Sequence, residues 1–243
     1  MTKKLDSFHL KIIAIIAMLI NHIGIGFNLF EYSNELYFFT ELVGKLTFPI
    51  MAFLLVEGFH YTKNVKKYAG RLAIFWIISI YPFHLLHLAN SPFSPTELVN
   101  NIFFTLLMGL ILIILYEKTN NVFLHVLLVI IFSLATIMSD WNLFGVLMIF
   151  GFYRIKDANL SKIIPPLYTT VIMFVIMLIG YFVSPSSVPI SIVISTLGIL
   201  GTIPLLLNYN GQRGYSPTWV KWGFYLFYPY DYFSPDKRIS IGF

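Results

Sequence analysis

The feature that most limits how this chain can fold is its series of long apolar runs without a charged side chain. Residues 163–183 (IIPPLYTTVIMFVIMLIGYFV) form one such run, and comparable runs recur along the whole chain. Only 11% of the residues are charged and 58% are hydrophobic, whereas soluble domains have about 25% and 45–50%. This composition excludes a soluble globule and a disordered chain. The runs are continuous rather than alternating, so they predict helices and not a β-barrel.

The runs predict an all-α, polytopic integral membrane helix bundle with about eight or nine transmembrane helices. Residues 1–243 are expected to form a single domain, in which residues 234–243 are a polar C-terminal tail. The predicted spans are 10–30, 42–59, 70–88, 101–116, 122–138, 142–153, 163–183, 189–207 and a short aromatic run at 222–233.

Charged residues between the spans predict the orientation. If the N-terminus is numbered as inside, the inside segments contain 13 of the 16 basic residues: Lys3, Lys4, Lys11, Lys63, Lys66, Lys67, Arg71, Lys118, Arg154, Lys156, Lys162, Arg213 and Lys221. The outside segments contain Glu31, Glu35, Glu41, Glu97 and Asp140, and no Lys or Arg. Cytoplasmic loops of membrane proteins carry this excess of positive charge. We therefore expect a cytoplasmic N-terminus in a bacterial inner membrane, and the net charge of +5 does not require a nucleic-acid partner.

His22 is the ionisable side chain placed most deeply in the first predicted span. It follows Asn21 and precedes Gly24 and Gly26, and such glycines allow a helix or a ligand to approach the backbone. An intramembrane ionisable group usually has a function, and histidine exchanges protons near neutral pH. The chain has no cysteine, which excludes a thiol nucleophile, so His22 is the best candidate for a general base. The alternative is a histidine that hydrogen-bonds between helices.

The second predicted span contains Lys45 and Glu57. Glu41 and Lys45 have the i,i+4 spacing of a helical ion pair, and Pro49 removes the backbone hydrogen bond to residue 45. Broken helices at membrane depth often line cavities, although Lys45 is also placed where it can reach an interface. Glu57 is expected either to contact a substrate or to pair with Lys63 or Arg71.

A basic segment follows this span. Lys66, Lys67 and Arg71 can bind the phosphates of a nucleotide-like cofactor, or they can serve as a topology anchor that touches anionic lipid. Arg71 opens an apolar span, where a guanidinium requires an anionic partner. We expect no metal site: the pair His84 and His87 has only Glu97 and Asp140 as candidate further ligands, and an interfacial, water-facing pair is favoured.

Three segments resemble the TraX family of membrane proteins: LKIIAIIAMLINHIG (10–24), GKLTFPIMAFLLVEGFHYTKNVKKYAGRL (44–72) and ISIYPFHLL (78–86). The late segment YNGQRG…FYLFYP (209–229) is also similar to that family. The chain has Asn21 where the family usually has Asp, and Lys45 where it often has Arg. The late motif reads Tyr228-Pro229-Tyr230-Asp231, where the family usually has a histidine after YP-x.

The resemblance implies an integral membrane acyltransferase that uses cytosolic acetyl-CoA, with His22, in the matching NHIG site, as the catalytic group. We expect Asn21 to orient His22, and Lys45 or Arg71 to stabilise the thioester oxyanion. Arg71, Lys67, Lys66, Glu57 and Arg154 are the candidate residues for binding acyl-CoA. The family namesake is associated with pilin acetylation, so the acceptor is expected to be an amine or hydroxyl of a peptide, a pilin-like protein or a cell-envelope component. The alternative is a non-enzymatic membrane transporter or a partner of a secreted peptide.

Overall fold

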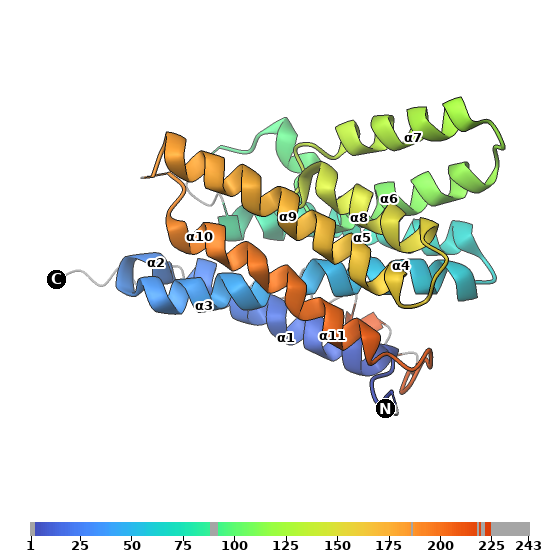
Figure 1. Cartoon of the computed structure of the whole chain (residues 1–243), viewed down its shortest axis with the longest axis horizontal. Helices are drawn as coiled ribbons and strands as arrows, with labels where there is room; N and C mark the ends of the chain where they lie inside the picture. Colours follow the sequence, from blue (N-terminus) through green and yellow to red (C-terminus); the bar gives the residue numbers. More distant parts are fainter. Residues whose placement is uncertain (1–2, 88–91, 186, 218, 220–221, 225–243) are drawn as a thin grey trace.

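The computed structural model describes residues 3–87, 92–185, 187–217, 219 and 222–224, and these residues form a bundle of helices along one long axis (Figure 1). The elements are α1 (Ser7–Gly26), α2 (Leu29–Tyr32), α3 (Asn34–Gly44), α4 (Thr47–Tyr61), α5 (Val65–His87), the 3₁₀ helix η1 (Pro95–Leu98), α6 (Ile102–Glu117), α7 (Val122–Ala135), α8 (Asn142–Arg154), α9 (Leu160–Val183), α10 (Ile190–Ser195), the 3₁₀ helix η2 (Thr196–Gly201) and α11 (Thr202–Leu207).

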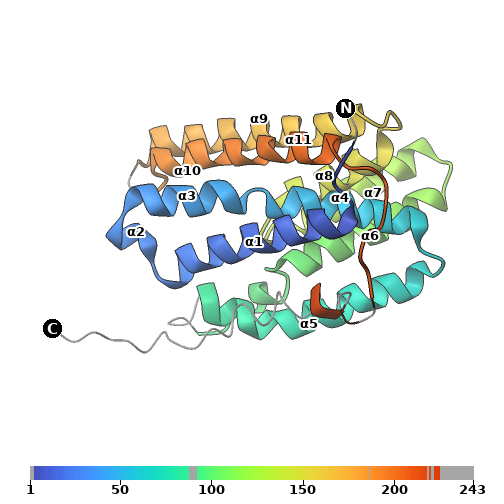
Figure 2. The ribbon, with the colours of Figure 1, turned by 90° about the horizontal axis from the view of Figure 1, so that it is seen from below.

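The helices run back and forth, so their connections gather at two ends of the bundle. The connections after α4, α6, α8 and α11 lie at the end where the chain starts, and those after α1, α5, α7 and α9 lie at the opposite end (Figures 1 and 2). We call the first of these the basic end, because the described Lys and Arg residues that the sequence grouped as inside lie in its connections or in the helix turns next to them. The side of the membrane that this end faces stays a prediction.

Helix α4 is the centre of the bundle. It packs against α1, α6, α8 and α11, and its buried residues lie on every side of the helix. Phe48 stacks on Trp141 with ring centroids 4.6 Å apart, and Phe53 meets Phe152 edge to face. A helix that is apolar all round needs to be enclosed by other helices. Near its end, α4 also carries Glu57 and His60, which line cavities described below.

The break predicted at Lys45 is present. Helix α3 ends at Gly44 and α4 begins at Thr47, so Lys45 and Leu46 separate two helices. Pro49 has no N–H to bond the carbonyl of residue 45, which accounts for the position of the break. The predicted span over 42–59 starts too late, because the helical stretch already begins at Asn34 and continues to Tyr61 beyond the break.

The first span is also shorter than predicted. Helix α1 ends at Gly26 instead of continuing to residue 30, and Asn28 adopts a left-handed conformation with φ of 51° before the short α2. Asparagine tolerates this conformation better than most residues. The predicted run at 222–233 and the tail at 234–243 lie almost entirely outside the described residues.

Within the described residues, four helical stretches are long and apolar enough to cross a membrane: Ser7–Gly26, Asn34–Tyr61, Leu160–Val183 and Ile190–Leu207. The helices α6, α7 and α8 are apolar but shorter. Large apolar side chains are exposed along α7 and α9, including Phe123, Leu134 and Val175. Exposed apolar area of this extent marks an interaction surface, and a lipid-facing helix requires it. The protein is therefore a helical membrane protein. The count of eight or nine spans stays a prediction.

Glycines allow close packing around α3. Gly24 of α1 lies against Thr40, as the sequence suggested for a glycine beside His22. On the other face of α3, Gly198 of η2 lies directly against the backbone carbonyl of Leu42, so a methyl group there would overlap the carbonyl oxygen. Backbone cannot move aside as a flexible side chain can, so this contact sets the distance between η2 and α3.

We predict that Gly198→Ala destabilises the protein by about 1–3 kcal/mol, because the added methyl forces η2 away from α3. The matched control is Gly70→Ala on α5, where a Cβ meets nothing within 4 Å and where alanine favours the helix by about 0.5–1 kcal/mol. Thermal unfolding of the two variants in detergent measures the difference. Equal melting temperatures would contradict the close approach of η2 to α3.

Candidate functional site

Glu41 joins α1 to the helix break. Its Oε1 accepts a hydrogen bond of 2.7 Å from Asn21 Nδ2, and its Oε2 lies 3.3 Å from Lys45 Nζ. The predicted i,i+4 pair of Glu41 and Lys45 is therefore present. Glu41 is only 8% exposed, and a buried carboxylate requires such partners. Asn21, Glu41 and Lys45 are called the interior polar network below.

His22 lies next to this network and is half-buried. Gly44, the last residue of α3, leaves room for the Asn21 side chain, since a Cβ there would come within 2.7 Å of it. Asp140, in the connection between α7 and α8, is influenced by the charges of Lys45, His22 and Glu41. The ends of α1 and α3 and the connection before α8 thus all carry ionisable groups in the half of the bundle farther from the basic end.

Two members of this arrangement were missed as site residues from sequence. Glu41 was recognised only as the partner of Lys45, although it also binds Asn21. Asp140 was recognised only as an outside charge. The i,i+4 spacing and the loop position were visible, but the packing of α3 on α1 was not.

The basic end contains a cavity of about 690 Å³ beside α1, α4 and α5. Its wall carries the cations Lys11, Lys63, Arg71 and Arg213 together with Glu57. Within the described residues the Nε of Arg71 is buried and has no hydrogen-bond partner, while its guanidinium lies 5.4 Å from the centre of the Tyr68 ring. A guanidinium in this state is suited to bind an anion that enters the cavity.

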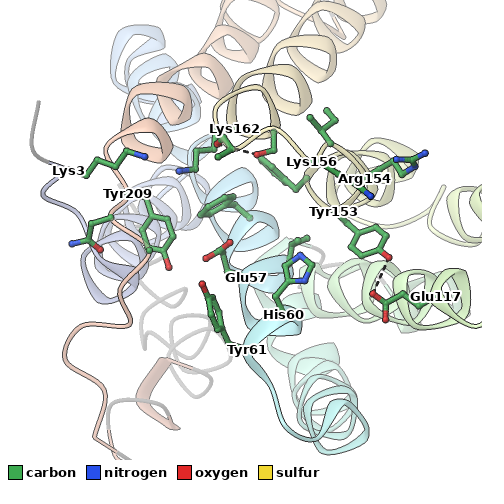
Figure 3. Close-up of a pocket in the computed structure, with 18 of the residues that line it drawn as sticks. Lys3, Glu57, His60, Tyr61, Glu117, Tyr153, Arg154, Lys156, Lys162 and Tyr209 are labelled. Carbon is green, nitrogen blue, oxygen red and sulfur yellow. Dashed lines mark hydrogen bonds between the residues drawn. The ribbon is translucent and has the colours of Figure 1, made fainter.

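A second cavity of about 820 Å³ lies on the other side of α4 (Figure 3). It is lined by the charged residues Lys3, Glu57, Glu117, Arg154, Lys156 and Lys162. His60 stacks on Tyr153, whose hydroxyl donates a hydrogen bond of 3.1 Å to Glu117 (Figure 3). Both cavities fall within the range of ligand sites, about 300–1,000 Å³. They are called the smaller and the larger cavity below.

The two cavities share a wall formed by Glu57, Tyr61, Tyr209 and Gly211. Residues Leu5 and Ser7 pair through backbone hydrogen bonds with the segment after α11, which holds Tyr209 in this wall. Burial raises the pKa of Tyr209 to about 12 and the Glu57 carboxylate acts in the same direction, while the hydrogen bond with Ser7 opposes them. Tyr209 therefore remains a neutral phenol at physiological pH.

The predicted cofactor-binding residues do not all reach these cavities. Glu57 lines both, Arg71 lines the smaller one and Arg154 lines the larger one. Lys66 and Lys67 are exposed on α5 and line neither. Glu57 makes no ion pair with Lys63 or Arg71 in the part of the chain that the structure describes.

The predicted catalytic residues Asn21, His22 and Lys45 also lie outside the linings of these two cavities. Ser7, Lys11 and Ile15 of α1 line the smaller cavity. His22 follows Ile15 at i+7, which places it on the same helical face. The rise of an α-helix puts it about 16 Å along the axis from Lys11.

The fold and the site thus define a class of protein: a helical membrane protein with basic cavities at one end and a polar network in its interior. The model of the TraX protein family matches residues 7–233, so the chain belongs to the TraX family. It is 31% identical, over 94% of each chain, to a probable fimbrial assembly protein FimC, serogroup H1, of Dichelobacter nodosus. No solved structure matches the chain.

We predict that Glu41→Gln destabilises the protein by about 1–3 kcal/mol, because Lys45 then lacks its anionic partner in a poorly solvated position. The double variant Glu41→Gln with Lys45→Met should recover much of this loss, since no unpaired charge remains. Thermal unfolding of the two single variants and the double variant forms the cycle. Additive losses would show that the two side chains do not interact.

Proposed function

We propose that the protein is a membrane-embedded acyltransferase that transfers an acetyl group from cytosolic acetyl-CoA to an acceptor amine or hydroxyl. The acceptor would belong to a peptide, a pilin-like protein or a cell-envelope component. Membership of the TraX family supports this proposal, and so does the similarity to a protein named for fimbrial assembly.

The observation that carries the proposal is the state of Arg71. Its buried Nε lacks a partner among the described residues, and the smaller cavity around it also presents Lys11, Lys63 and Arg213. Phosphate groups satisfy such a cluster because they accept charge-assisted hydrogen bonds from guanidinium and ammonium donors. The phosphates of coenzyme A would therefore bind at this mouth, with Arg71 as the principal contact.

The thin pantetheine arm would then extend along α1 toward His22. The lining residues Ser7, Lys11 and Ile15 form a stripe on the helical face that His22 continues. Met18 is buried on this helix between Ile15 and His22, so the arm needs this side chain to move aside. The geometry supports a donor bound at the basic end and chemistry in the interior.

In the proposed reaction the acceptor nitrogen or oxygen attacks the thioester carbonyl carbon, and its proton passes to the His22 imidazole. The C–S bond breaks, and the departing thiolate takes the proton from the imidazolium. Asn21 orients the histidine, while Lys45 stabilises the negative charge on the carbonyl oxygen. Glu41 positions both residues through the interior polar network. General base catalysis of this kind contributes about 10²–10⁴-fold.

The alternative is a proton-linked transporter in which His22 carries the proton. Transporters commonly contain paired broken helices. In the described structure α3 and α4 are separated at Lys45–Leu46, and the stretch Ile190–Leu207 changes to a 3₁₀ helix at Thr196–Gly201. Proton-coupled uptake into proteoliposomes, abolished by a protonophore, would favour this alternative.

We predict that purified protein releases coenzyme A from acetyl-CoA, and that His22→Ala lowers this rate at least about 10²-fold. The chain has no cysteine, so a thiol reagent reports coenzyme A without a background from the protein. His9→Gln, an exposed histidine on the same helix, is the matched control. Unchanged release by His22→Ala would remove His22 from the mechanism.

Arg71→Gln should raise the KM for acetyl-CoA about tenfold or more, with a smaller change in kcat, because the contact binds ground state and transition state alike. Lys118→Gln is the control, since Lys118 is an exposed residue of the basic end that lines neither cavity. A fall in kcat at unchanged KM would contradict a phosphate-binding role.

A further inference from the structure

Lys162 occupies an unusual position in the larger cavity. It is only 7% exposed, and its ammonium forms no hydrogen bond or ion pair with any residue that the structure describes. It lies 5.8 Å from the centre of the Phe53 ring and 5.5 Å from that of Tyr209. Cation–π contacts of this kind stabilise an ammonium only in part, and a lysine residue with so little exposed surface normally has a partner.

A second ammonium approaches the same place. Lys3 and Lys162 reach toward one another across the rim of the cavity, with Glu57 on the α4 side below them (Figure 3). The charges of Lys3 and Glu57 both act on Lys162, the first repelling it and the second attracting it. Lys156 and Arg154 line the same cavity. Four cations therefore face two carboxylates, Glu57 and Glu117, and the excess of positive charge is concentrated where the two lysines converge.

The floor beneath these ammonium groups is apolar. Phe53, Val56 and Phe152 line the cavity and are buried in the core. A free inorganic ion would fill little of a space of about 820 Å³. A ligand that matches the whole cavity needs an anionic group at the lysines and an apolar or aromatic body against the floor.

We propose that the larger cavity is a second ligand site, separate from the proposed donor site, for a molecule with a carboxylate or phosphate group on an apolar body. The ammonium of Lys162 binds the anionic group from within the cavity, and Lys3 closes over it at the rim. This proposal does not depend on acetyl transfer, because the anion is bound by Lys162 and Lys3, which do not line the smaller cavity.

The probes are phenyl phosphate and benzoate, which share an aromatic body and differ in the anion, with benzyl alcohol as their neutral counterpart. Binding to the full-length protein in nanodiscs is measured by ligand-observed NMR. We expect both anions to bind and Lys162→Met to weaken each of them about tenfold or more, because one charge-assisted contact is lost. The matched control Lys118→Met should bind as the unmodified protein does.

Stability separates a binding role from a structural one. Lys162→Met removes a buried charge that lacks an anionic partner and keeps the length of the side chain, so its melting temperature should be unchanged or higher. A lower melting temperature with unchanged probe binding would overturn the proposal. Equal binding of benzyl alcohol and the anions would also overturn it, since the lysines would then contribute nothing.

Two further arms identify the source of the anion and test the separation of the sites. Competition by soluble short-chain phosphatidic acid would assign the site to a lipid headgroup, and failure of phosphatidic acid to compete would assign it to a smaller free anion such as the probes. Inorganic phosphate that competes as well as phenyl phosphate would overturn the requirement for an apolar body. Coenzyme A should bind Lys162→Met normally and Arg71→Gln weakly. Parallel loss of coenzyme A binding in both variants would show a single merged site and refute a separate one.

Discussion

The cost of placing charge among apolar side chains organises this protein. An ionised group that leaves water needs an opposite charge, several hydrogen bonds or a route back to water. Glu41 has an opposite charge and a hydrogen bond, since Lys45 contacts one of its oxygens and Asn21 donates to the other. Most of the remaining Lys and Arg residues have a route back to water, because they lie at the basic end of the bundle. Lys162 has neither an ion pair nor a hydrogen bond among the described residues, and its ammonium lies near two aromatic rings at the edge of a cavity.

This constraint explains which parts of the fold were readable from sequence. Apolar runs without charge predicted most helices to within a few residues, because desolvation cost and helix length are both local properties of the chain. The start of α3 at Asn34 was placed too late. The break at Lys45 was also local, since Pro49 acts on a carbonyl four residues earlier. The end of α1 was placed too late, because Phe27, Leu29 and Phe30 are apolar and conceal the turn that Asn28 makes in a left-handed conformation.

The sites were less readable because they combine distant segments. Asn21 and Glu41 meet only because α3 packs on α1, and the close approach of Gly24 to Thr40 is visible only once the two helices are placed together. The larger cavity draws Lys3, Glu57, Lys162 and Tyr209 from four parts of the chain. Sequence patterns predicted the charge type of the cavity residues and the end of the bundle where they lie. They did not separate Arg71 and Glu57, which line a cavity, from Lys66 and Lys67, which line neither.

The position of Glu57 connects the proposed donor mouth with the larger cavity. Helix α4 lies between the two spaces, and Glu57 contributes to the wall of both together with Tyr61 and Tyr209. Tyr209 stays neutral, so the wall presents one carboxylate to cations on either side. The anions proposed for the two cavities would each lie near this carboxylate, which repels them, so the cations that line each cavity have to outweigh it. The smaller cavity has Lys11, Lys63, Arg71 and Arg213 for this purpose, and the larger has Lys3, Lys156, Lys162 and Arg154.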